Sequence, residues 1–208
     1  DVLPSKIVDR TFFINEKNYN IVTISIITDS LNLWSNDSGI YVLGPHANNE
    51  VPYYGANFRQ KWSRWSRLEI FDKIQNKISQ EEFDLEIHGN YGRYLDQKSF
   101  RLDFKSKFSG DLNYPIISDQ IHITNYNNIN LRREPPPSLI TDVYAAKIGK
   151  SKNIDVNGFE PCVLYLNGQF WGLYYIREKI DSEYIKSKHD IINEIDLING
   201  SDNNLRVY

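Results

Sequence analysis

Two stretches in which apolar and polar residues alternate strictly flank a glycine loop near the middle of the chain. They are residues 83–88 and 99–104, and Gly89 and Gly92 lie between them. A side-chain period of two is typical of a β-strand that buries one face. The sequence therefore predicts a strand, a glycine loop and a second strand in direct succession, and only folds that contain such a unit fit the chain.

Further strands are predicted on both sides of this unit. The segments that alternate in part, or form short apolar runs, are residues 20–29, 40–43, 65–72, 163–166 and 172–176. The last two flank Asn167 and Gly168, a dipeptide that favours the tight turn of a β-hairpin. The 14 Tyr, 10 Phe and 4 Trp are residue types that strands prefer, so we expect mostly β-structure.

One segment has clear helical spacing. Three prolines precede it, apolar residues then recur at intervals of one helical turn, and Gly149 ends the pattern. This pattern predicts a helix over about residues 138–149. A shorter helix is expected over residues 182–188.

These elements predict a β-rich fold of the α+β class. We expect two units joined near residue 80, because strand patterns lie on both sides of that point. Residues 1–80 are expected to form a sandwich-like antiparallel β-module. Residues 81–208 are expected to form a second unit that contains the glycine loop and the main helix.

The composition excludes several classes of protein. Hydrophobic residues make up 40% and charged residues 25%, which is typical of a folded globular chain. The net charge of −3 gives no reason to expect a nucleic-acid partner, and no apolar run is long enough to span a bilayer. The single cysteine, Cys162, cannot form an internal disulfide. The four histidines show no metal-ligand spacing, and no nucleophile elbow is present.

The glycine loop is the first candidate site. Backbone amides in such a loop can approach phosphates, and a lysine on the following strand, here Lys98, can reach them as a point charge. A plain hairpin with two glycines is the common alternative. Glu178, at the end of the second hairpin strand, is either part of a site or one member of a solvated charge cluster.

Four aromatic residues suggest a different kind of site. Tyr53, Tyr54, Trp62 and Trp65 are close in sequence and could form a face that stacks on sugars. Packing in the core or in loops is the more common role of such residues.

Taken in order, several segments resemble the CotH kinase family in a bacterial envelope form. Residues 87–93 and the run Gln97-Lys98-Ser99-Phe100-Arg101-Leu102 are similar to the opening of its kinase domain. Leu131-Arg132 and Asp142 resemble its next elements. Residues 166–174, followed by Arg177-Glu178-Lys179-Ile180, resemble the most recognisable stretch of the family. Residues 39–44, 54–58 and 68–72 resemble the region that precedes the domain.

The resemblance implies an atypical protein-kinase-like N-lobe over residues 81–208 and a nucleotide cofactor, ATP with Mg or Mn. Lys98, together with Gly89, Gly92 and Arg93, would then contact the phosphates. Glu178 would lie near the hinge between lobes, and Asp142 would orient Lys98. The resemblance also implies a secreted or cell-envelope location and a protein phosphoacceptor.

The chain departs from the family in two places. Residues 133–137 differ from the usual polar run before an Arg-Asp pair, and Thr141 stands where the arginine would be. The catalytic and metal-binding aspartates of the family follow a stretch similar to residues 196–200, which lies close to Tyr208. We therefore expect residues 1–208 to grip a nucleotide without transferring phosphate. Two alternatives use no phosphoryl chemistry: an envelope binding or adhesion module, and a carbohydrate-binding module.

Overall fold

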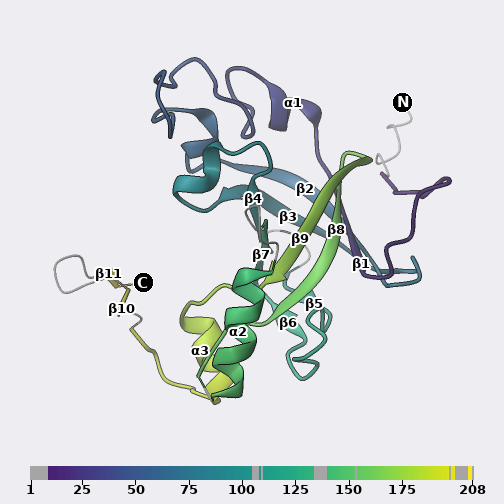
Figure 1. Ribbon diagram of the computed structural model, residues 1–208, viewed down its shortest axis with the longest axis vertical. Helices are drawn as coiled ribbons and strands as arrows, with labels where there is room; N and C mark the ends of the chain where they lie inside the picture. The colour runs from purple at the N-terminus through teal and green to yellow at the C-terminus, as the bar shows by residue number, and fades with distance from the viewer. Residues whose placement is uncertain are drawn as a thin grey trace, which may run out of the picture.

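A computed structural model describes residues 9–104, 108, 110–133, 140–152, 154–196, 198–199 and 206–207 (Figure 1). Seven of its strands close into one barrel: β1 (Val22–Ile27), β2 (Ser63–Phe71), β3 (Lys77–His88), β4 (Ser99–Asp103), β7 (Asn128–Arg132), β9 (Gln169–Arg177) and β8 (Phe159–Leu166), in this order around the barrel. Two small two-stranded sheets lie outside it: β5 (Leu112–Asn113) with β6 (Asn125–Tyr126), and β10 (Ile198–Asn199) with β11 (Arg206–Val207). The prediction of a β-rich α+β fold is confirmed.

The barrel closes through a pair of strands that are far apart in sequence. Its other neighbouring strands are antiparallel, but β1 and β8 run parallel, with Val22 opposite Cys162 and Ile26 opposite Leu166. The residues that face inward form one continuous apolar core, which includes Phe83 and Leu102 at 0% exposure. This core is what fixes the strands in place.

The predicted division of the chain at residue 80 does not follow the strand pairing. Residue 80 falls inside β3, which pairs with β2 on one side and β4 on the other. β1 and β2, which the sequence assigns to a separate sandwich, share the barrel and its core with the strands after residue 80. The inner faces of β1 and β2 pack on this shared core, and β8 and β3 are their hydrogen-bonded neighbours.

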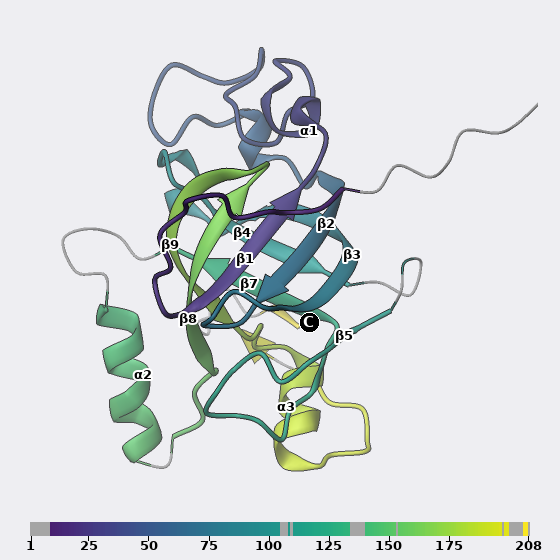
Figure 2. The same cartoon turned by 90° about the vertical axis from the view of Figure 1, so that its right-hand side faces the viewer.

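The segment between β1 and β2, residues 29–60, covers one end of the barrel and is called the lead-in segment below (Figure 2). It contains the short helix α1 (Ser30–Trp34) and the 3-10 turn η1 (Asn57–Arg59). The strand predicted at residues 40–43 is wrong. The amides of Ile40 and Tyr41 bond back to the carbonyls of Asn32 and Leu33, so this stretch closes a turn after α1 instead of pairing as a strand.

Two longer helices lie at the other end of the barrel (Figure 2). They are α2 (Thr141–Ser151) and α3 (Ser182–His189), so both predicted helices are present, although residues 138 and 139 lie outside the described part of the chain. The predicted hairpin is confirmed too. Asn167 and Gly168 join β8 to β9 with φ of 49° and 78°, the left-handed backbone that this turn needs. Within the described residues, no helix is long and apolar enough to cross a membrane.

Candidate functional site

The two faces of β4 have opposite character. Phe100 and Leu102 point into the barrel and are fully buried, whereas Ser99, Arg101 and Asp103 alternate with them on the outer face and are partly exposed. Side chains along a strand alternate between its faces. The alternation therefore also decides where Lys98, directly before β4, can point.

Lys98 lies on the inner side, with Phe100. Its side chain is 4% exposed, and Nζ donates to the carbonyl of Leu95 at 2.7 Å. Nζ also lies 4.4 Å from the ring centroid of Phe58 and 4.9 Å from that of Tyr41. Burial lowers the pKa of Lys98 from 10.5 to about 8, an effect that Asp96 partly opposes. This geometry does not support the expected contact between Lys98 and phosphates, because aromatic rings enclose the charge of Lys98.

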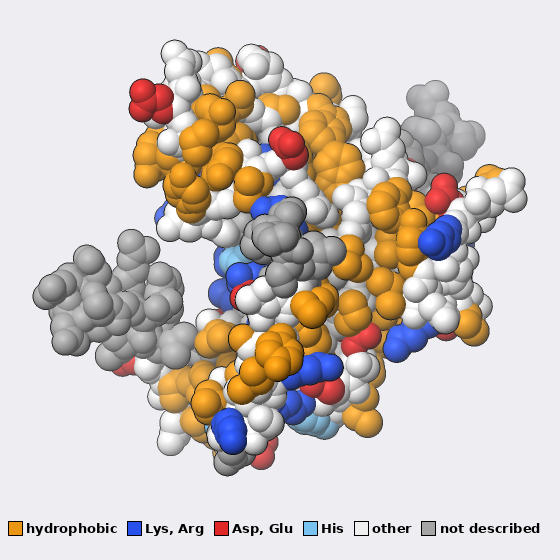
Figure 3. All heavy atoms as spheres, in the orientation of Figure 1, with side chains coloured by type: hydrophobic (Ala, Val, Ile, Leu, Met, Phe, Trp, Pro, Cys, Tyr) orange, Lys and Arg blue, Asp and Glu red, His pale blue; other side chains and the backbone are white. Residues whose placement is uncertain are grey.

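The cavity beside the glycine loop is formed by the outer face instead. It has a volume of about 330 Å³ and is lined by His88, Gly89, Asn90, Gly92, Leu95, Ser99, Arg132 and Arg133. His88 and Ser99 are opposite each other on β3 and β4, and Arg132 ends β7 beside them. Lys98 is not among the lining residues. Figure 3 shows basic and histidine side chains gathered in a hollow between the upper loops and the lower helices.

Arg132 is held in place by a carboxylate on α2. Its Nη2 atom lies 2.5 Å from Oδ2 of Asp142, and Nη1 of Arg177 lies 3.8 Å from the same oxygen. The resemblance implies that Asp142 orients Lys98. In the structure Asp142 pairs with Arg132 instead, because both Arg132 and Asp142 are outside the barrel and Lys98 is inside. The site residues predicted from the sequence do not include Arg132. Arg132 directly follows the apolar Leu131 on a strand, and this alternation places it on the outer face.

The electrostatic potential at this cavity is positive. The pKa of His88 falls from 6.5 to about 4, first because the ring is buried and then because Arg101, Arg93, Arg132 and Lys179 disfavour a further positive charge. His88 is therefore neutral near pH 7, and its Nδ1 lies 3.3 Å from Nη2 of Arg101. Four cations that converge on one neutral ring make a site suited to an anion.

The glycine loop, residues 89–97, opens onto this cavity. Gly89 has φ of 103°, and a Cβ atom built on it would meet nothing within 4 Å, so ligand atoms have room to approach its backbone. Gly92 needs no unusual φ and serves the turn η2 (Tyr91–Tyr94). The side chain of Arg93 folds over the loop, and its Nε donates to the carbonyl of Gly89 at 2.6 Å. This hydrogen bond stabilises the loop and occupies the Nε donor of Arg93.

The hairpin β8–β9 supports the far end of the glycine loop. The side-chain amide of Gln97 donates to the carbonyl of Leu173 at 3.3 Å, and the hydroxyl of Tyr174 donates to the carbonyl of Lys98 at 2.8 Å. Gly172 has φ of 128°, and a Cβ there would lie 2.7 Å from the Gln97 amide nitrogen. The aromatic, glycine-containing stretch of the hairpin is thus a support for the loop.

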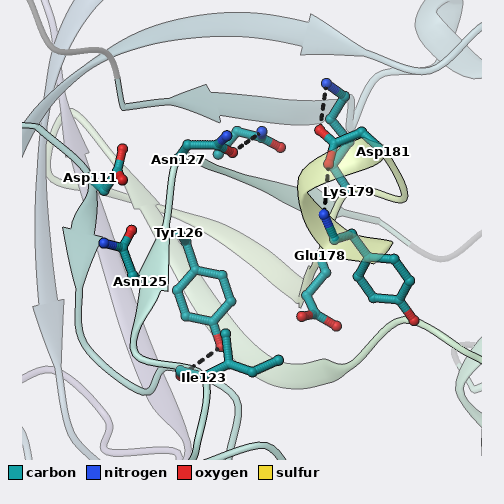
Figure 4. Close-up of a pocket in the computed structure, with 10 residues that line it drawn as sticks. Asp111, Ile123, Asn125, Tyr126, Asn127, Glu178, Lys179 and Asp181 are labelled. Carbon is teal, nitrogen blue, oxygen red and sulfur yellow. Dashed lines mark hydrogen bonds and ion pairs between the residues drawn. The ribbon is translucent and has the colours of Figure 1, made fainter. Parts of the chain in front are cut away.

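Glu178 lies beside a second cavity, of about 320 Å³, between the β5–β6 sheet and α3 (Figure 4). It directly follows β9, is 6% exposed, and accepts from the amide of Gly158 at 2.7 Å. Burial raises its pKa, while the Gly158 bond and Lys188 oppose the rise. Tyr126 and Tyr184 also line this cavity. Glu178 therefore occupies the connection from the barrel to α3.

One strand links the two cavities. Arg132 lines the first cavity, Asn128 lines the second, and both are on the outer face of β7. Four residues of a strand span roughly 13 Å. Between them, Oδ1 of Asn130 is buried without a hydrogen-bond partner among the described residues, and so is Nε of the neighbouring Arg101. Both atoms lie beneath the surface of this face, between the two cavities.

The four aromatics that could stack on sugars do not share one environment. Tyr53 and Trp62 pack against the core, whereas Tyr54 and Trp65 are 65% and 43% exposed. The two exposed rings are each covered by an arginine, Arg59 over Tyr54 and Arg67 over Trp65.

The family comparison agrees with the order of these elements. The sequence model described as CotH kinase protein matches residues 85–206, more than half of the chain. The chain belongs to the CotH kinase family. The matched region starts within β3 and includes the glycine loop, Arg132, Asp142 and Glu178, but not the lead-in segment. No curated protein matches the chain.

Proposed function

We propose that the chain holds the triphosphate of a nucleotide, ATP in the first instance, in the cavity beside the glycine loop, as the nucleotide-binding part of a protein kinase. The observation that carries this proposal is the ion pair between Arg132 on β7 and Asp142 on α2. In protein kinases a lysine on the strand before a helix contacts the phosphates and pairs with a glutamate of that helix.

The order of elements supports the comparison. In protein kinases a glycine-rich loop between two strands covers the phosphates, and the strand with the lysine and the helix with the glutamate follow. Here β3, the glycine loop, β4, β7 and α2 follow one another in the same order, apart from the small sheet β5–β6. Arg132 takes the place of the lysine and Asp142 that of the glutamate. An arginine can bind phosphate with two parallel hydrogen bonds, which a lysine cannot.

The nucleotide would lie along the outer face of β7. Its phosphates would contact Arg132 and the backbone at Gly89, where the potential is positive. Its base would enter the cavity beside Glu178, whose tyrosines and polar groups suit a flat heterocycle.

A divalent metal, Mg or Mn, would arrive with the nucleotide and neutralise charge on its phosphates. The described residues contain no group of three or more His, Cys, Asp or Glu side chains placed to hold a metal ion. These residues fit the phosphates but not the metal, so no catalytic step through it is derived. A protein acceptor and a secreted or envelope location rest on the family likeness.

Titration calorimetry with magnesium and ATP tests the proposal. Arg132→Met should weaken binding about ten- to hundredfold, the value of one charge-assisted contact of roughly 1.5–3 kcal/mol. Arg10→Met is the matched control, because Arg10 is exposed and lines neither cavity. Wild type that binds no nucleotide, or equal affinities for wild type and Arg132→Met, would overturn the proposal and favour a binding module without phosphoryl chemistry.

A further inference from the structure

The lead-in segment touches the glycine loop at several points, although the family match begins only at residue 85. η1 of the lead-in segment lies against η2 of the glycine loop. Guanidinium nitrogen Nη1 of Arg93 donates to the carbonyls of Phe58 and Arg59, both at 3.4 Å. The loop is thus bonded from one side by a part of the chain that lies outside the matched residues.

Tyr41 is the centre of this contact. Its hydroxyl donates to the carbonyl of Asp96 at 2.7 Å and accepts from the amide of Lys98 at 3.0 Å. It also accepts from Nε1 of Trp171 on β9 at 3.1 Å. One donor and two acceptor positions are all that a tyrosine hydroxyl offers. Tyr41 is a buried residue, and its single hydroxyl therefore joins the lead-in segment, the end of the glycine loop and β9.

Lys98 completes the same contact. Its ammonium group lies between the rings of Tyr41 and Phe58, both in the lead-in segment, and donates to Leu95 in the glycine loop. A desolvated cation over aromatic faces is stabilised by roughly 0.5–2 kcal/mol. The Lys98 ammonium group thus connects the end of the loop to two rings of the lead-in segment.

We propose that Tyr41 and Lys98 form a clamp by which the lead-in segment positions the glycine loop over the phosphate site. The proposal rests on the nucleotide site proposed above and gives Lys98 a positioning role without contact to the ligand. A loop that is fixed before binding loses less conformational entropy when phosphate arrives. The clamp therefore raises affinity for the phosphates and leaves affinity for the nucleoside unchanged.

Two variants test the clamp in the 208-residue chain. Tyr41→Phe keeps the ring and removes the three hydrogen bonds. Lys98→Met keeps an unbranched apolar side chain and removes the charge, and it guards against a Tyr41→Phe chain that does not fold. Tyr54→Phe is the control, because Tyr54 is in the same segment and its side chain is 65% exposed. Hydrogen exchange of amides 89–97 reports the loop, and calorimetry with inorganic tripolyphosphate and with adenosine separates the two halves of the ligand.

Both clamp variants should speed amide exchange in the glycine loop, by about tenfold for Tyr41→Phe and about threefold for Lys98→Met, with β1 and β8 unchanged. Tripolyphosphate affinity should fall by about three- to fivefold in each, while adenosine affinity stays the same. Unchanged loop exchange, or equal losses for both ligands, would overturn the clamp. Wild type that binds neither ligand would refute the proposed function instead, and faster loop exchange would still support the clamp.

Discussion

Lys98 and Arg132 are cations on opposite sides of the same barrel wall. Lys98 is 4% exposed and faces two aromatic rings and a carbonyl. Arg132 is half-exposed, pairs with Asp142 and lines an open cavity. One charge is part of the packing and the other faces solvent where a ligand can enter.

The difference shows that strand parity outweighs motif position. A lysine soon after a glycine loop suggests a phosphate contact, but the side of the strand decides whether it can make one. Lys98 shares its side with Phe100 and Leu102, which belong to the core. Arg132 shares its side with Ser99 and His88, which line the cavity.

The largest effect should come from the inner face of β4. Phe100 is fully buried and its ring contacts those of Tyr41 and Tyr174, so Phe100→Ala should lower the free energy of unfolding by about 3–5 kcal/mol. Ser99→Ala, on the outer face, loses one bond from the amide of Arg133 and should cost about 1 kcal/mol. Urea denaturation measures both, and similar losses would contradict the assignment of the two faces.

The next effect is a pH dependence that depends on Lys98. Its pKa is about 8 in the folded chain, below the 10.5 of the unfolded chain. Between these values the unfolded chain holds the extra proton, so stability should rise with pH above 8, by at most roughly 3 kcal/mol. In Lys98→Met the rise between pH 8 and 10 should vanish. Urea melts across this range compare the two chains, and an identical slope would place the Lys98 charge in solvent.

On the outer face the titrating group is His88. Its folded pKa of about 4 lies below 6.5, so the unfolded chain takes up the proton first as the pH falls. Stability should therefore be lost between pH 6.5 and 4, by roughly 1–2 kcal/mol because the ring is only partly buried. His88→Gln should flatten this part of the curve of unfolding free energy against pH. A curve that keeps its slope would mean that neither burial nor the four cations lower the pKa of His88.

The smallest effect on stability should come from the ion pair outside the barrel. Arg132 and Asp142 have side chains 49% and 36% exposed, so Asp142→Asn should change the free energy of unfolding by less than about 1 kcal/mol. The same substitution should weaken nucleotide binding by about threefold, because Arg132 is no longer held toward the cavity. A large loss of stability with unchanged binding would make the pair structural.

Much of the fold is predictable because it depends on local patterns. The alternation at residues 83–88 and 99–104 predicts β3 and β4, and Asn167-Gly168 predicts the turn between β8 and β9. The closure of the barrel is not predictable in this way. It depends on the parallel pairing of β1 with β8, about 140 residues apart, for which no local signal exists.

The sequence predicts where the candidate site lies more readily than it predicts which residues form it. The glycine loop and Glu178 each lie beside a cavity. The short distance in sequence between Lys98 and the glycines favours Lys98 as the phosphate-binding cation, but only if the side of the strand is ignored. Phe100 and Leu131 are apolar residues of the inner face. Counting alternate residues from them places Lys98 on the inner face and Arg132 on the outer face, so the sequence pattern favours Arg132.

The most direct measurement follows both cations at once during binding. With lysine and arginine labelled by ¹⁵N, NMR resolves the side-chain nitrogens of Lys98 and Arg132 while magnesium and ATP are added. We expect the chemical shifts of the Arg132 guanidinium to change in proportion to the bound nucleotide. The chemical shift of the Lys98 ammonium group should change no more than those of other buried side chains. A shift of Lys98 with none at Arg132 would contradict the assignment of the phosphate site to the outer face of the barrel.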